Sequence, residues 1–259
     1  MERPQLSSKE QFGRTAEAYS RSWSHRTGET IEVLEQMVAK NGRRFHHAVD
    51  IATGTGFAAF TIAPYAERVT ATDITPQMLD QARSIAAERQ IANITFSLMA
   101  AESLQFPDQS ADLVICRIAA HHFLEFDAFL SEANRVLEPG GVLVVCDTSA
   151  PEDPELADWM NDIEVRRDTS HILNRSPSQW QQALETHGFN VTDAQVCSTW
   201  HEMEDWTSRA QVPDDERLRI RADFLATTPA HRDAFQITIG DDGVIKWSWD
   251  AAVLRAEKP

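Results

Sequence analysis

The stretch His-Ala-Val-Asp-Ile-Ala-Thr-Gly-Thr-Gly-Phe-Ala-Ala-Phe, residues 47–60, passes from a short apolar run through two glycines into a helix-favouring segment. This pattern predicts a strand, a tight turn and a helix whose first N–H groups point at a ligand. Gly54 and Gly56 allow such a turn and let the backbone approach a ligand where a Cβ atom would clash. Ordinary turns between strands and helices also use glycine, so the neighbouring sequence has to distinguish the two interpretations.

Beyond this loop, strand-like and helix-like segments alternate up to about residue 150. Strands are expected at Arg68–Thr72, Ile94–Met99, Asp112–Cys116 and Val142–Cys146, and helices from Gly28 to Lys40, from Thr75, and from Glu125 to Leu137. Such alternation is typical of an α/β fold with a parallel, doubly wound sheet, whose ligands bind at the carboxyl ends of the strands. The residues at or just past these ends are Asp50, Asp73, Ala101, Glu102, Arg117 and Asp147.

The sequence after residue 150 differs in composition from the part before it. Six of the seven tryptophans lie there, and we expect most of them in the core, with some available to line an apolar pocket. A capped helix is predicted from Ser176 to Gly188, followed by a strand at 189–199, helices within 203–233 and a half-buried final strand over 245–253. We expect one domain with added lid segments.

Composition limits the classes of function. The chain has 259 residues and a formal net charge of −16, which disfavours direct binding to nucleic acid. No apolar run approaches the roughly 18 residues of a membrane span, and the N-terminus lacks the apolar core of a signal peptide. Cys116, Cys146 and Cys197 lie far apart and are expected to be buried, reduced thiols. We therefore expect a cytoplasmic protein.

Two aspartates give information about the ligand. Asp73 ends the second expected strand about 20 residues after the glycine loop, where a carboxylate can accept hydrogen bonds from both hydroxyls of an adenosine ribose. A strand-end aspartate could instead cap the turn before Thr75. Asp50 brings negative charge near the loop, which disfavours a pyrophosphate and favours a ligand with cationic groups.

Five sequence blocks stand in order: Asp50-Ile-Ala-Thr-Gly-Thr-Gly56, Asp73-Ile-Thr-Pro-Gln-Met78, Ala101-Glu-Ser-Leu-Gln-Phe106, Ala111-Asp-Leu-Val-Ile-Cys-Arg117 and Leu137-Glu-Pro-Gly-Gly141. Together they resemble the class I S-adenosylmethionine-dependent methyltransferases, in the branch near the ubiquinone/menaquinone C-methyltransferases. The segments 12–28 and 119–123 resemble an uncharacterised bacterial subgroup of that branch. The resemblance covers residues 10–150 well and the tail loosely, so it is specific for the cofactor and nearly silent on the acceptor.

The resemblance implies a Rossmann-like, doubly wound, mostly parallel sheet of seven strands, with helices on both faces and an antiparallel last strand. It implies a single domain over residues 1–259. This domain would comprise an N-terminal helical lid (1–40), a cofactor-binding core (41–150) and a C-terminal part of the sheet with a helical lid insertion (151–259).

The resemblance also implies a set of residues that bind S-adenosylmethionine. They are Tyr19, His25, Asp50, Ala52, Thr53, Gly54, Gly56, Asp73, Ile74, Met78, Ala101, Glu102 and Arg117. The backbone of the glycine loop would cradle the methionine part, Asp50 would lie beside its ammonium group or a water bound to it, and Asp73 would hold the ribose. The family often has glycine in place of Ala52, and aspartate in place of Ala100, which leaves the adenine edge to Glu102.

The remaining implied roles concern the adenine and the sulfonium end of the cofactor. Ile74 and Met78 would enclose the adenine, and the Ala101 N–H and Glu102 would face its edge. Arg117 would contact the cofactor through its backbone.

Methyl transfer is an in-line displacement, so catalysis can rest largely on positioning, and a base is needed only if the acceptor must lose a proton. His121 and His122 follow the fourth expected strand, where a substrate should lie, and are the catalytic candidates. Either could instead pack against Phe123 or order the loop. No metal site is expected, because companion ligands at suitable spacing are lacking. Tyr19 and His25 could close over the cofactor or form a plain helix contact.

Two other functions are compatible with such a fold. A short-chain, nicotinamide-dependent reductase would need a Tyr-x-x-x-Lys pair, but Tyr19 and Tyr65 are followed four places later by Trp23 and Val69. A non-catalytic cofactor-binding module that acts through partners remains open.

The acceptor is expected to be a small molecule, modest in size and partly apolar, in a site that excludes water. Its covers would be residues 8–28 and 202–233, with a contribution from 151–175. The sequence defines neither the attacked atom nor the oligomeric state.

Overall fold

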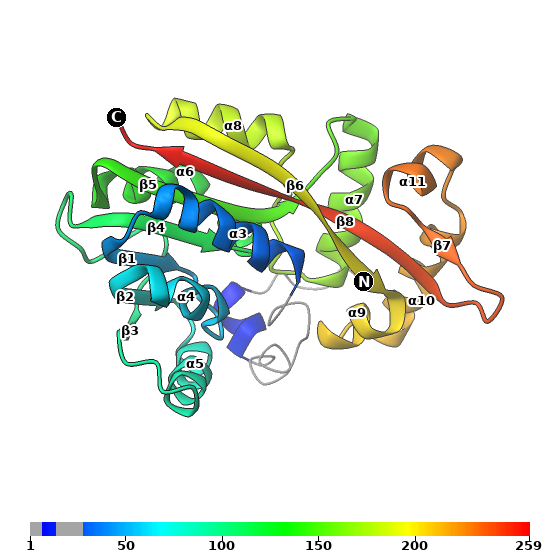
Figure 1. Ribbon diagram of the computed structural model, residues 1–259. Helices are drawn as coiled ribbons and strands as arrows, with labels where there is room; N and C mark the ends of the chain where they lie inside the picture. Colours follow the sequence, from blue (N-terminus) through cyan, green and yellow to red (C-terminus); the bar gives the residue numbers. More distant parts are fainter. Residues whose placement is uncertain (1–6, 14–27) are drawn as a thin grey trace.

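The computed structural model describes residues 7–13 and 28–259. The strands of these residues form a single mixed sheet. Its strands pair in the order β3-β2-β1-β4-β5-β8-β6, and the short β7 pairs with the start of β8 (Figure 1). The strands are β1 (Phe45–Ile51), β2 (Ala66–Asp73), β3 (Ile94–Leu98), β4 (Ala111–Arg117), β5 (Leu137–Ser149), β6 (Asn190–Glu202), β7 (Thr238–Ile239) and β8 (Ile245–Glu257).

The first five strands are parallel, and β8 is antiparallel to both of its neighbours, β5 and β6. The expected seven-stranded, mostly parallel sheet with an antiparallel last strand is therefore confirmed, with the two-residue β7 added to it. The chain proceeds from β1 to β2 on one side, whereas β4 lies on the other side of β1. Ligands of such sheets bind at the carboxyl ends of the strands beside this switch point.

Helices cover both faces of the sheet, as a doubly wound fold requires. They are α3 (Glu29–Ala39), α4 (Phe57–Ile62), α5 (Pro76–Glu88), α6 (Phe126–Val136), α7 (Pro154–Arg167), α8 (Pro177–Thr186), α9 (Met203–Arg209), α10 (Asp214–Leu225) and α11 (Pro229–Ala234), with 3-10 turns η1 (Lys40–Gly42), η2 (Ala63–Tyr65) and η3 (Ala120–His122). Alternate residues of β1 point to opposite faces, so Ala48 packs with α3 and α4 while Val49 packs with α6 and α8. Within the described residues, no helix is long and apolar enough to cross a bilayer.

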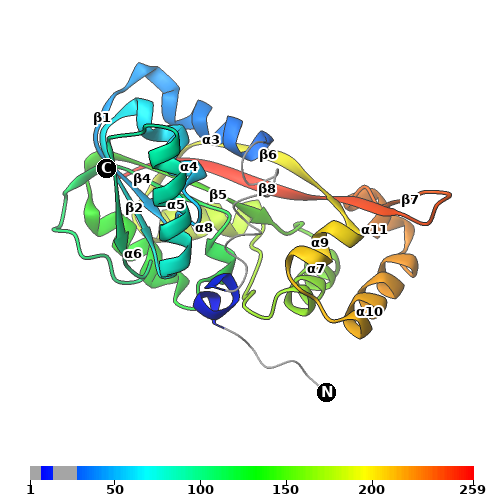
Figure 2. The ribbon, with the colours of Figure 1, turned by 90° about the horizontal axis from the view of Figure 1, so that it is seen from below.

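An aromatic cluster lies beyond the parallel part of the sheet, where β6 and β8 extend toward α7, α9 and α10 (Figures 1 and 2). Trp206, Trp247 and Trp249 are buried in it, and Trp180 is buried under α6, which confirms a mostly core role for the tryptophans. Among the other described tryptophans, Trp159 is partly buried against the same cluster and Trp200 is 56% exposed. The prediction of a half-buried final strand holds only for the start of β8, where Lys246 and Asp250 are exposed. It is wrong from Ala251 to Ala256, where β8 lies between β5 and β6 and is buried on both faces.

The start of the fifth strand was predicted less accurately from the sequence. We expected a helix up to Leu137 and a strand from Val142, but β5 already starts at Leu137. The Gly140 N–H donates to the carbonyl of Lys258 (2.8 Å), and the Lys258 N–H donates to the carbonyl of Gly141 (3.0 Å), so the Pro-Gly-Gly segment stays hydrogen-bonded to the residues that follow β8.

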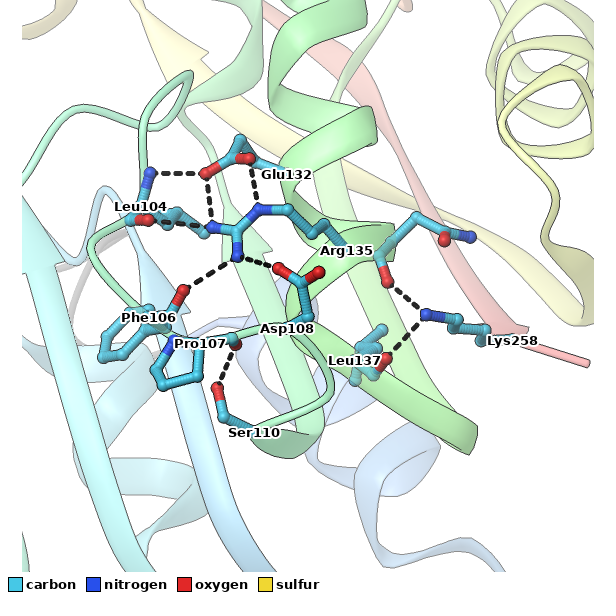
Figure 3. Close-up of polar contacts among 10 residues, drawn as sticks. Leu104, Phe106, Pro107, Asp108, Ser110, Glu132, Arg135, Leu137 and Lys258 are labelled. Carbon is cyan, nitrogen blue, oxygen red and sulfur yellow. Dashed lines mark hydrogen bonds and ion pairs between the residues drawn. The ribbon is translucent and has the colours of Figure 1, made fainter.

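Arg135 of α6 holds the loop between β3 and β4 in place (Figure 3). Its guanidinium donates to the carbonyls of Leu104 (2.9 Å) and Phe106 (2.8 Å) and to both carboxylate oxygens of Glu132. The same guanidinium lies 2.7 Å from Asp108. Hydrogen bonding to Arg135 lowers the pKa of Glu132, so the carboxylate stays ionised. The clamp fixes the loop that starts just after residues 101–102.

Candidate functional site

A cavity of about 500 Å³ lies at the carboxyl ends of β1, β2 and β4. This size is within the range of small-molecule and cofactor sites. Eleven predicted site residues line it: Asp50, Ala52, Thr53, Gly54, Asp73, Ile74, Met78, Ala101, Glu102, Arg117 and His122. Gly56 and His121 lie beside it, and Tyr19 and His25 fall outside the described residues. The structure therefore brings together residues that the sequence spreads over more than 70 positions.

The two glycines of the loop have different structural roles. Gly54 has φ 54°, and a Cβ atom there would meet no heavy atom within 4 Å, so its backbone faces open cavity. Gly56 has φ 91°, and a Cβ atom there would meet Cζ of Phe60 at 2.5 Å. Gly54 thus leaves room for a ligand, whereas Gly56 lets α4 pack against the loop. Ala52 also has a positive φ of 54°, which explains why a glycine would suit that position.

Asp50 is a buried carboxylate with an unfilled acceptor. The Thr53 hydroxyl donates to its Oδ2 atom at 2.6 Å, whereas its Oδ1 atom has no partner in the described part of the chain. Burial raises the pKa of Asp50 to about 7, against the lowering effect of the Thr53 hydroxyl. A cationic ligand group beside Asp50 would favour its ionised form and fill the empty acceptor.

Asp73 organises the loop from the end of β2. Its Oδ2 atom accepts the N–H of Gly54 at 2.8 Å, and its Oδ1 atom accepts the N–H of Thr75 at 2.8 Å. The second of these bonds is the turn cap that we considered as an alternative role. A carboxylate oxygen can accept two hydrogen bonds, so Asp73, which lines the cavity, retains acceptor capacity for a ligand.

One end of the cavity is suited to a flat apolar group. Ile74 is 43% exposed there, although it is a large aliphatic side chain, and Met78 and Met99 line the same cavity. Ala101 and Glu102 complete the lining on the loop held by Arg135.

The two predicted catalytic histidines occupy the turn η3 and differ in their partners. Nδ1 of His121 lies 2.6 Å from Oδ1 of Asp147, and the His121 N–H donates to Oδ2 of the same carboxylate (2.8 Å). Burial lowers the pKa of His121, but the adjacent Asp147 carboxylate outweighs it, so that the pKa is raised overall. Nδ1 of His122 lies 3.0 Å from the Ser170 carbonyl, and burial beside His121 lowers the pKa of His122 to about 4. Only His121 therefore has the partner of a typical general base.

Arg117 lines the cavity, and its side chain also connects β4 to α3. Its guanidinium is buried, and Nη2 donates to the hydroxyl of Thr30 on α3 at 2.7 Å. The next residue, Ile118, has φ 51°, which is strained for a β-branched side chain, and its N–H donates to the Cys146 carbonyl (2.7 Å). This strained backbone lines the cavity beside Ala119.

Two segments cover the cavity, and both lie within segments that the sequence predicted as covers. Phe12 comes from the helical segment 8–13, and its ring lies 4.9 Å from the ring of His122. Ser170 and Ile172 come from the loop after α7. Both lie within expected covers, but no residue of the expected cover 202–233 lines this cavity. Figure 2 shows the blue 8–13 segment between α5 on one side and α7 and α9 on the other.

Known proteins resemble this chain over most of its length. A family model described as a methyltransferase domain matches residues 49–145. The uncharacterized methyltransferase YcgJ of Bacillus subtilis is 32% identical over 232 residues, covering 90% of this chain and 91% of YcgJ. The crystal structure of YcgJ matches with a TM-score of 0.83 at 31% identity, covering 88% of this chain and 97% of that chain.

Two further relatives match smaller shares. The uncharacterized protein YafE of Escherichia coli is 35% identical over 159 residues, covering 61% of this chain and 77% of YafE. A demethylmenaquinone methyltransferase of Tropheryma whipplei is 34% identical over 150 residues, covering 54% of this chain and 58% of that protein. The likeness to quinone methyltransferases is therefore less extensive than the likeness to YcgJ.

Proposed function

The chain belongs to the class I S-adenosylmethionine-dependent methyltransferases, and we propose that it methylates a small molecule bound beside the cavity at the carboxyl ends of β1, β2 and β4. The observation that carries this proposal is the buried Asp50, which lines that cavity together with Gly54 and whose Oδ1 atom has no hydrogen-bond partner in the described part of the chain. When bound, S-adenosylmethionine supplies an electrophilic methyl carbon attached to a cationic sulfur.

The residues present fit this cofactor. Asp50 would bind its ammonium group, directly or through a water, because the pair neutralises a buried charge. The Gly54 backbone would hold the methionine part, and Asp73 would accept hydrogen bonds from the ribose hydroxyls. Ile74 and Met78 would enclose the adenine, whose edge would face the Ala101 N–H and Glu102.

We further propose that His121 acts as the general base when the acceptor must lose a proton. An ionised carboxylate only accepts hydrogen bonds, so the Nδ1 atom of His121 that faces Asp147 carries the proton, and Nε2 is the basic nitrogen. His122, with a pKa of about 4, is neutral at pH 7 but is a weaker base and packs against Phe12. The rest of the reaction would depend on an in-line arrangement in a water-poor site.

The enzyme is proposed to act in the cytoplasm. Cys116, Cys146 and Cys197 are all unpaired and buried. Burial raises the pKa of Cys146 far above its usual range and that of Cys197 to about 11, so these thiols stay protonated and unreactive. Reduced structural thiols of this kind suit a reducing compartment.

Two measurements test the proposal against its alternatives. Calorimetry should show micromolar-range binding of S-adenosylmethionine and S-adenosylhomocysteine, without detectable binding of NAD(H), and a preference for NAD(H) would overturn the role of Asp50. Transfer of a labelled methyl group to members of a metabolite panel should then occur. Tight cofactor binding with no transfer to any acceptor would favour a non-catalytic module.

A further inference from the structure

A second, smaller cavity of about 90 Å³ adjoins the large one. Phe12, Ile118 and His122 are among the residues that line both. The second cavity extends away from the glycine loop toward α7 and α9, which Figures 1 and 2 show beside the ends of β6 and β8. His121 also lines it, so a methyl acceptor bound there would lie beside the proposed base.

The charged side chains of this wall contact other groups of the protein. Their partners are Thr30 for Arg117 (2.7 Å), Asp205 for Arg209 (3.0 Å), and the ring of Trp206 for Arg167 (4.8 Å from the guanidinium carbon to the ring centroid). The carboxyl group of Glu164 lies 3.7 Å from Nη1 of Arg167. Because these charged groups already have partners in the protein, they do not by themselves define a ligand.

The amide of Asn174 is buried in the same wall, and this side chain is only 2% exposed. Neither its Nδ2 nor its Oδ1 atom has a hydrogen-bond partner in the described part of the chain. Most buried polar side chains are hydrogen-bonded, because an amide removed from water without a partner lowers the stability of the protein. An unsatisfied amide in the wall of a cavity therefore indicates a polar ligand.

The main chain of Asn174 is held in place beside the histidines. Its N–H donates to Oδ1 of Asn161 (2.7 Å), and its carbonyl accepts from Nδ2 of Asn161 (3.3 Å). The N–H groups of the two preceding residues, Ile172 and Leu173, donate to the carbonyl of His121 at 2.8 Å and 3.1 Å. These bonds fix the position of Asn174 relative to the proposed base, as a substrate-binding residue requires.

We propose that Asn174 binds the methyl acceptor in the second cavity and that the acceptor carries an uncharged amide or lactam group. This inference rests on the proposed methyltransferase function. The Oδ1 atom of Asn174 accepts hydrogen bonds and its Nδ2 atom donates them, so a group with a donor and an acceptor side by side satisfies both. A primary amide or a lactam has such an edge, whereas a carboxylate has no donor and an ammonium group has no acceptor.

The size of the cavity limits the part of the acceptor that it holds. The volume accommodates on the order of six water molecules, enough for an amide group and a few attached carbon atoms. Trp206 and Trp249 line the same cavity and would contact those carbon atoms. The shared lining at Ile118 and His122 connects this site to the large cavity, from which the methyl group would come.

Binding of small amides tests the proposal directly. Wild-type protein saturated with S-adenosylhomocysteine is titrated calorimetrically with propionamide and 2-pyrrolidone, and with butanone and cyclopentanone, which have similar shapes but no N–H donor. We expect at least one amide to bind at least about fivefold more tightly than its ketone. Asn174→Leu should abolish this preference, and so should Asn174→Asp, which keeps the size but replaces the donor by an acceptor. The matched control is Asn190→Leu at the exposed start of β6, which lines neither cavity and should keep the preference.

Thermal unfolding of the ligand-free protein gives an independent readout. Leucine is close to asparagine in size and has no polar side-chain atom, so Asn174→Leu should raise the melting temperature by at least about 2 °C. Asn161→Leu is the matched control, because both of its amide atoms are hydrogen-bonded within the protein, and it should lower the melting temperature. A lower melting temperature in Asn174→Leu would show that the amide serves the fold rather than a ligand, and would overturn the inference.

The outcomes separate this inference from the proposed function. If S-adenosylhomocysteine binds but neither amide binds more tightly than its ketone, the acceptor inference is wrong and the cofactor assignment stands. A preference that persists in both Asn174 variants places the amide elsewhere and also overturns the inference. If S-adenosylhomocysteine itself fails to bind, the proposed function fails, and the acceptor inference fails with it.

Discussion

The Nδ1 atom of His121 lies 2.6 Å from the Oδ1 atom of Asp147, which joins the turn after β4 to the end of β5. The Asp147 carboxylate raises the pKa of His121 above its usual value, although burial alone would lower it. A base must be deprotonated, so the rate should rise with pH as His121 loses its proton. In Asp147→Asn the pKa of His121 should fall, and the acidic limb of the pH–rate profile should move to lower pH.

Imidazole NMR titration measures that pKa without any acceptor, and methyl-transfer rates give the profile once an acceptor is known. His121→Gln should lower turnover at least about tenfold, the lower range for general base catalysis. His122→Gln is the matched control, because its pKa of about 4 keeps it neutral over the same pH range. If neither variant loses tenfold, no histidine base operates and positioning alone carries the reaction.

Asp73→Ala should weaken binding of S-adenosylhomocysteine by about 1–3 kcal/mol, the cost of losing a charged hydrogen-bond acceptor. The same change leaves the N–H groups of Gly54 and Thr75 without their acceptor, so the melting temperature should also fall. Calorimetry and thermal unfolding measure the two effects separately. Asp80→Ala, on the exposed side of α5, should change neither the affinity nor the cavity. Unchanged affinity in a folded Asp73→Ala variant would leave Asp73 with only its role in the turn.

Gly54→Ala should mainly reduce cofactor affinity, whereas Gly56→Ala should mainly reduce stability. At Gly54 the methyl group enters open cavity, so the protein should fold at a cost of roughly 1–2 kcal/mol for its φ of 54°. Its affinity for S-adenosylhomocysteine should fall at least about tenfold, which is 1.4 kcal/mol. At Gly56 the methyl group clashes with Phe60, so the main loss, about 1–3 kcal/mol, should appear in urea unfolding. Equal affinity losses and equal stability losses in both variants would contradict this division.

Ala52→Gly should stabilise the protein by about 0.5–1 kcal/mol, because glycine adopts a φ of 54° without the steric cost that alanine bears. Ala87→Gly in α5 is the matched control, since there the same substitution should destabilise by about 0.5–1 kcal/mol. Urea unfolding measures both. A loss of stability in Ala52→Gly would mean that the left-handed backbone at this position costs nothing.

Hydrogen exchange with and without S-adenosylhomocysteine tests the covers of the large cavity. Protection should increase in residues 7–13 and 168–175, because Phe12 and Ile172 line the cavity. Residues 214–234 should be unchanged, because they pack on the aromatic cluster and do not line this cavity. A change confined to the loop around Gly54 would show a permanently packed shell rather than a closing one.

The sequence determined the parts of this protein that depend on local periodicity and on short, ordered motifs. The strand–glycine–helix unit, the parallel sheet and the helices α3, α5 and α6 lie close to where hydropathy and capping residues predicted them. Asp50, Gly54 and Asp73 were identified because they belong to short motifs that follow the expected strands. In a doubly wound sheet, residues that follow consecutive strands share one edge, so sequence position alone brings them to the same cavity.

Only the tertiary structure decided which distant segments meet. Three contacts could not be predicted from local sequence patterns, because each joins residues that are distant in the sequence. They are the pairing of His121 with Asp147, the bond from Arg117 to Thr30 and the packing of Phe12 against His122. The same holds for β8, whose alternating polarity predicted one solvated face. From Ala251 to Ala256 its insertion between β5 and β6 buries both faces, because burial is set by the neighbours that pack on a strand rather than by its own period.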